Sequence, residues 1–133
     1  MLLLSSCGTS GHIIFYNFDF PKDSIQNELQ RVFNEDSAYS VPNKWIDCYK
    51  LAMPGVMFLY FKQNPEEMYE IRFSGDSEEW KKSPVCRLAL TYQFDGDRWR
   101  KDGELRRTEE KRICKRFETE ILSKIKYRYF ASD

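Results

Sequence analysis

One segment, residues 56–62, places the strongest restriction on the fold of this 133-residue chain. Its first six residues are all apolar, so a strand here would be apolar on both faces. One face would carry Val56, Phe58 and Tyr60, and the other would carry Met57, Leu59 and Phe61. Strands of this kind are normally central in a sheet and covered on both sides. The segment therefore predicts a sheet with a packing layer on one face and some cover over the other.

The pattern on either side of this segment predicts an α+β domain. Alternating apolar residues indicate further strands at 12–20, 44–51, 68–74 and 85–94, and a short edge strand at 98–100. Apolar residues at helical spacing indicate one helix that ends near residue 34 and a long one over about 104–126. The long helix should bury four residues together, Ile113, Phe117, Ile121 and Ile125.

The expected order is β-α-β-β-β-β-α, because strands joined by short loops pair in antiparallel fashion. We expect an antiparallel sheet of about five strands with both helices packed on one face. Residues 12–133 should form this single domain, since 41% of the chain is apolar and 16% is aromatic.

The N-terminus carries a short motif, Leu4-Ser5-Ser6-Cys7 followed by Gly8. An apolar residue, two small residues and a cysteine resemble the lipobox of bacterial lipoproteins, in which lipid is attached to the cysteine thiol. The resemblance implies lipid attachment at Cys7 and anchoring in the cell envelope. Gly8 stands where an aspartate often retains such proteins in the inner membrane, so the resemblance implies the outer membrane. Residues 1–11 would then be a shortened signal and lipid-attachment segment with a linker.

The alternative to this interpretation is a cytoplasmic protein with an accidental motif. A secretory signal has a positively charged start and roughly 7–15 apolar residues before cleavage. Only Met1 to Leu4 precede the small residues here, without Lys or Arg, so a full signal would require sequence upstream of Met1. No run of 18 apolar residues occurs, and no transmembrane helix is predicted.

The sequence offers little for catalysis, metal binding or cofactor binding. His12 is the only histidine, and no glycine-flanked serine or cysteine indicates a nucleophile elbow. The acids of residues 95–104 fail the calcium-loop pattern, because Trp99 and Arg100 stand where an oxygen ligand and a glycine are needed. Cys48, Cys86 and Cys114 are expected to be small buried side chains, with one disulfide as the alternative. We expect no enzyme activity, no cofactor and no metal.

Charge is unevenly distributed along a chain whose net charge is +0. Residues 100–128 hold 11 Lys or Arg against 6 Asp or Glu. This basic helix could face anionic headgroups or an acidic partner, although a solvated face with internal ion pairs is the simpler interpretation. Nucleic-acid binding is not expected, because Glu109, Glu110, Glu118 and Glu120 share the helix.

The strand at 56–62 also provides the candidate binding residues, Met57, Phe58, Tyr60 and Phe61. If both helices cover one face, large apolar side chains remain on the other face, and such patches mark partner surfaces. The alternative is that the N-terminal linker, the loop at 75–84 or the tail at 127–130 folds over them. The leading hypothesis is a small non-enzymatic envelope lipoprotein that binds a protein partner. The alternatives are a soluble cytoplasmic binding module and a small hydrolase that uses carboxylates.

Overall fold

A computed structural model of the chain describes residues 12–48 and 53–133. Its strands are β1 (Ile14–Phe18), β2 (Val56–Phe61), β3 (Glu67–Phe73), β4 (Cys86–Phe94), β5 (Trp99–Arg100) and β6 (Tyr129–Ser132). Its α-helices are α2 (Lys22–Glu35), α3 (Ser77–Lys82) and α4 (Arg107–Glu120). Three short 3₁₀ helices join them, η1 (Ser37–Tyr39), η2 (Asn43–Cys48) and η3 (Leu122–Lys124).

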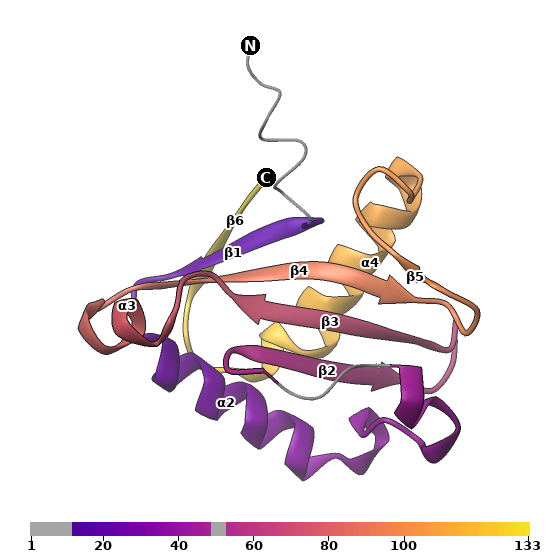
Figure 1. Cartoon of the computed structure of the whole chain (residues 1–133), viewed down its shortest axis with the longest axis horizontal. Coiled ribbons are helices and arrows are strands. Elements are labelled where there is room, and N and C mark those ends of the chain that lie inside the picture. The colour runs from indigo at the N-terminus through magenta and orange to yellow at the C-terminus, as the bar shows by residue number, and fades with distance from the viewer. Residues whose placement is uncertain (1–11, 49–52) are drawn as a thin grey trace.

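The strands form one antiparallel sheet in the order β2-β3-β4-β1-β6, with β5 paired to β4. The first strand therefore lies between β4 and the last strand, and its Phe15 pairs with both Ala89 and Ser132. The predicted α+β class and the antiparallel sheet are confirmed. Figure 1 shows the sheet from the face that α4 does not cover, with α4 crossing behind it.

Both long helices pack on the same face of the sheet, as expected. Their four-residue spacing of apolar side chains gives each helix one buried side. For α2 this side is Ile25, Leu29, Val32 and Phe33, and for α4 it is Ile113 and Phe117. These side chains form one core cluster with the sheet residues Met57, Leu59, Phe61, Tyr69, Ile71, Leu88 and Leu90.

The segment predicted as a strand at 44–51 is a different element. Residues 43–48 form the 3₁₀ helix η2, and residues 49–51 lie outside the described part of the chain. In a 3₁₀ helix, side chains three residues apart share one side. Trp45 and Cys48 have this spacing, and both pack into a second, smaller core cluster. The alternating pattern therefore reflects a short segment that packs against the sheet, and the prediction of a ladder strand there was wrong.

The end of the chain also differs from the expected single long helix. The four residues predicted to be buried are 0%, 0%, 0% and 7% exposed, for Ile113, Phe117, Ile121 and Ile125. The α-helix ends at Glu120, however, and η3 follows it, with the Ile125 amide donating to the Leu122 carbonyl. The tail then continues into β6 at the edge of the sheet.

Candidate partner-binding surface

The two sides of β2 have different environments, and this separates the four candidate residues. Met57 and Phe61 face the helices and are 8% and 1% exposed, so they belong to the main core. Phe58 and Tyr60 face the opposite side of the sheet. Cys7, the predicted lipid-attachment residue, lies outside the described residues.

The end of the opposite face that includes Tyr60 is covered by η2. The Trp45 ring contacts the Tyr60 and Phe94 rings edge-on, with centroids 5.3 and 5.0 Å apart. Lys44 forms an ion pair with Glu66, and Glu66 also accepts a hydrogen bond from the Tyr60 hydroxyl. These contacts hold η2 on the sheet and leave Tyr60 only 8% exposed. Among the described residues, the cover over Tyr60 thus comes from residues 41–48 and not from the loop at 75–84 or the tail at 127–130, and the N-terminal linker lies outside the described residues.

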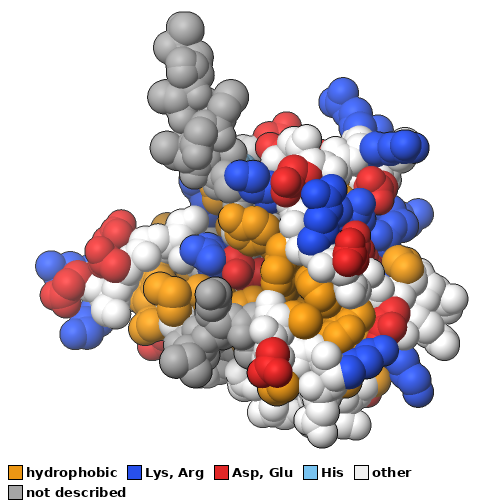
Figure 2. Space-filling model, turned by 45° about the vertical axis from the view of Figure 1, so that its right-hand side comes forward, with side chains coloured by type: hydrophobic (Ala, Val, Ile, Leu, Met, Phe, Trp, Pro, Cys, Tyr) orange, Lys and Arg blue, Asp and Glu red, His pale blue; other side chains and the backbone are white. Residues whose placement is uncertain are grey.

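Beside η2 lies a group of three half-buried aromatic side chains, Phe58, Tyr92 and Trp99, which we call the aromatic platform. The Trp99 ring contacts the other two, with centroids 5.9 Å from Phe58 and 6.3 Å from Tyr92. Its indole N–H donates to the Cys48 carbonyl at 2.6 Å, which fixes the ring against η2. Figure 2 shows hydrophobic side chains gathered across the middle of the visible face, with charged side chains around them. The platform is therefore an ordered aromatic surface that water still reaches.

The rest of this face is polar and carries its own hydrogen bonds. The Glu70 carboxylate accepts from Arg72 at 2.7 Å and from the Thr91 hydroxyl at 2.7 Å. Further along, Asn17 accepts from Arg87 at 3.1 Å. A hollow of about 350 Å³ adjoins this part of the face, and two exposed apolar residues line it, Val85 and Phe130. The face thus has an apolar end at the platform and a polar middle.

On the helix side, a buried ion cluster fixes the position of α4 against the sheet. Glu67 is 0% exposed and accepts hydrogen bonds from Tyr69, Gln93, Arg112 and Arg116, all at 2.7–2.9 Å. Burial alone would raise the pKa of Glu67, but the bonds from Arg112, Gln93 and Arg116 outweigh it and lower that pKa. We call this set the Glu67 cluster. Sequence analysis missed it, although Arg112 and Arg116 each precede a buried residue of α4 by one position.

Within the described ranges, 12–48 and 53–133, no group of His, Cys, Asp and Glu side chains could hold a metal ion. Burial raises the pKa of the Cys86 thiol to about 12 and that of Cys114 to about 11, which leaves both protonated at neutral pH. Among the described cysteines no disulfide forms.

Comparison of the chain with protein-family models, curated proteins and solved structures finds no match to any of them. In the described part of the chain, no helix is both long enough and apolar enough to cross a membrane.

Proposed function

We propose that this protein is a small non-enzymatic lipoprotein of the bacterial envelope, anchored through Cys7, whose domain binds a protein partner through the aromatic platform. The observation that carries the binding part is the position of Phe58, Tyr92 and Trp99. They lie on the sheet face that the long helices do not cover, next to η2, and all three are half-buried.

Large aromatic side chains that are held in place and still reached by water are typical of interface anchors. They bring apolar area to a contact and have little conformational freedom left to lose when the partner binds. The polar middle of the face, with Arg72 and Arg87 exposed, would form the rim around such a contact. The anchoring part of the proposal rests on the Leu4-Ser5-Ser6-Cys7 motif.

Two matched substitutions on β2 test the binding surface. Phe61→Ala removes a fully buried ring and should lower the free energy of unfolding by about 3–5 kcal/mol. Phe58→Ala removes a half-buried ring three positions away on the opposite face, and we expect a loss of about 1 kcal/mol. A protein that co-purifies with the wild type from envelope fractions should be lost with Phe58→Ala.

The control for this experiment is Phe130→Ala, which removes an equally large ring that is 60% exposed at the far end of the same face. It should retain the co-purifying protein. If Phe58→Ala destabilises the domain as much as Phe61→Ala does, the platform belongs to the core and the proposal fails. Equal loss of the partner in the Phe130→Ala control would also contradict it.

The anchoring part has its own test in cells. A fatty-acid analogue supplied to cells that express the gene with its upstream sequence should label the protein, and Cys7→Ser should abolish the label. The labelled protein should fractionate with membranes, because the two or three chains of a lipoprotein cysteine hold far more firmly than one. Unlabelled wild-type protein that stays in the soluble fraction would refute the anchor.

A further inference from the structure

Three basic residues of α4, Arg107, Lys111 and Lys115, follow one another at four-residue intervals, and all three are exposed. Residues at this spacing share one side of a helix. We call them the basic stripe. The ion pairs that α4 forms with described residues involve other side chains, namely Glu109 with Arg100, Arg112 and Arg116 with Glu67, and Arg116 with Glu120. Apart from the attraction between Arg107 and Glu110, the stripe thus presents its positive charge to solvent.

The acidic residues of the same helix have their own interactions, although Glu110 and Glu118 each stand three positions from a residue of the stripe. Glu109 accepts from Arg100 and from the Arg106 backbone, Glu118 accepts from the Tyr16 hydroxyl at 2.9 Å, and Glu120 pairs with Arg116 at 2.8 Å. Burial and the neighbouring Asp102 raise the pKa of Glu110 to about 7. The Glu110 carboxyl group is therefore only partly ionised near neutral pH. The acidic side chains of α4 are therefore bonded to other residues or only partly ionised, which leaves the stripe with an excess of positive charge.

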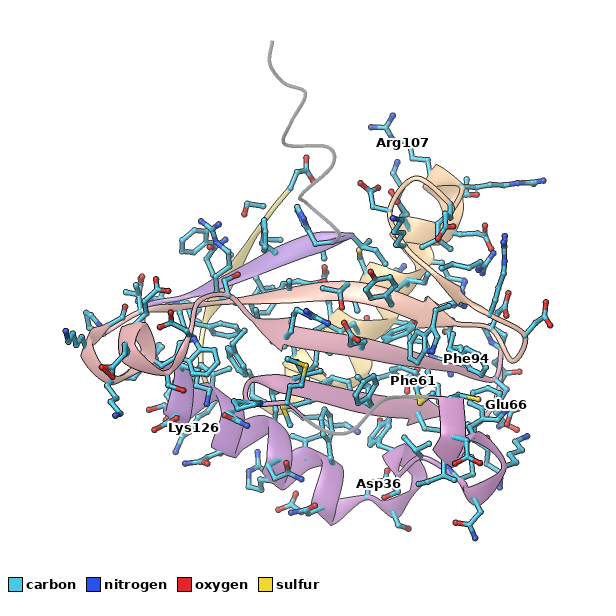
Figure 3. All side chains as sticks on the ribbon, viewed as in Figure 1. Asp36, Phe61, Glu66, Phe94, Arg107 and Lys126 are labelled. Carbon is cyan, nitrogen blue, oxygen red and sulfur yellow. The ribbon has the colours of Figure 1, made fainter. Side chains whose placement is uncertain are left out.

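The stripe also begins at the end of the molecule where β1 starts. Arg107 lies at the top of the view in Figure 3, and β1 starts near the top of Figure 1, as does α4. The two figures have the same view. A lipid on Cys7 would be separated from His12 by four residues, which span about 14 Å when fully extended. An anchored domain would therefore be held with this end close to the headgroups.

We propose that the basic stripe binds the anionic headgroups of the membrane to which the protein is anchored; this inference rests on the proposed lipid attachment at Cys7. Each basic residue near an anionic surface contributes a small electrostatic attraction, and three together give weak binding. The tether makes weak binding sufficient, because it keeps the domain at a high local concentration beside the surface.

This contact would also orient the domain. The basic stripe belongs to α4, whereas the aromatic platform lies on the opposite face of the sheet. A domain held on the membrane by the end where β1 and α4 start would leave the platform, on the sheet face that α4 does not cover, in contact with solvent. The two surfaces would then act together, one holding the orientation and the other binding the partner.

The test uses the whole chain with Cys7→Ser, so that no acyl chain contributes, and measures co-sedimentation with vesicles. Vesicles of phosphatidylglycerol and phosphatidylcholine should bind the protein, and vesicles of phosphatidylcholine alone should not. The triple variant Arg107→Gln, Lys111→Gln and Lys115→Gln should lower the partition coefficient on the order of 100-fold. For the protein with the unaltered stripe, raising the salt concentration should also lower the partition coefficient.

A matched control removes the same charge elsewhere, with Lys62→Gln, Lys81→Gln and Lys82→Gln, all exposed and outside α4. This control should retain most of the binding. Equal loss in the control, equal binding to neutral vesicles or no binding to anionic vesicles would overturn the inference. Tighter binding to a single-stranded oligonucleotide than to vesicles at the same salt would also overturn it. Fatty-acid labelling of the wild type does not depend on these outcomes. The proposed lipid anchor and the proposed headgroup binding by the basic stripe can therefore be refuted independently.

Discussion

Replacing Phe117 by alanine is expected to lower the free energy of unfolding by about 3–5 kcal/mol, as truncation of a buried aromatic side chain does. Phe117 is 0% exposed, and its ring contacts the Tyr16 ring of β1 with centroids 5.5 Å apart. The substitution would leave a cavity between α4 and the sheet, because neighbours on two different elements cannot both move into the space. Urea unfolding followed by tryptophan fluorescence and by circular dichroism measures the change.

Lys115→Ala on the exposed side of the same helix serves as the control, and we expect a change of about 0.5 kcal/mol or less. It tests whether the loss comes from the packed side of α4 rather than from helix propensity. A loss below about 1 kcal/mol for Phe117→Ala would mean that α4 is not docked on the core.

Replacing Glu67 by glutamine should cost about 3–5 kcal/mol at neutral pH, because it leaves Arg112 without an anion and Arg116 with Glu120 alone. Arg116 is the more affected of the two, since its side chain is 11% exposed whereas that of Arg112 is 37% exposed. The matched control is Glu66→Gln at the neighbouring position, where the carboxylate is 33% exposed and pairs with Lys44. Its loss should be about 1 kcal/mol or less, as for partly exposed ion pairs.

The effect of Glu67→Gln should also depend on pH, in a direction fixed by the lowered pKa of Glu67. A carboxyl group whose pKa is lower in the folded state contributes stability above its unfolded pKa, and this stability is lost as pH falls through the folded value. The difference between wild type and variant should therefore be largest at neutral pH and shrink below about pH 4. A difference that stays constant down to acid pH would show that the loss comes from altered packing rather than from charge.

The sequence was most informative where the spacing of apolar residues along a helix or strand marks the side that will be buried. The alternation in β4 and the four-residue steps of Ile113, Phe117 and Ile121 require only a nearby core, and both elements form. The alternation in β4 was wrong beyond Leu90, because a register shift against β3 places Tyr92 and Phe94 on the other face of the sheet. The two-sided strand β2 forms at the predicted residues, but it lies at an edge of the sheet and not at the centre, where such strands are normally found. Its second face is partly covered by η2, which substitutes for the second layer that such a strand normally has.

The parts that could not be predicted depend on contacts between distant residues. The short strand β6 has only four residues and no strong alternation, and it forms because β1 offers a partner edge. Trp45 fits a strand pattern as well as a 3₁₀ helix, and only its packing against Tyr60 and Phe94 decides between them.

The candidate site, too, was predictable only in part from the sequence. The apolar content of β2 was visible in the sequence, but the assignment of Phe58 to the open face and Phe61 to the core required the structure. Likewise, Arg112 and Arg116 were counted with the exposed basic residues, although they contact Glu67 45 and 49 residues earlier in the chain.

The pairing of β1 with both β4 and β6 has a consequence for how the chain acquires its structure. Asn17 of β1 donates to Ser132 of β6, 115 residues later, and accepts from Arg87, 70 residues later. The first strand therefore cannot be incorporated into the sheet until most of the chain has left the ribosome. Such long loops close slowly, so folding should be rate-limited by these late pairings.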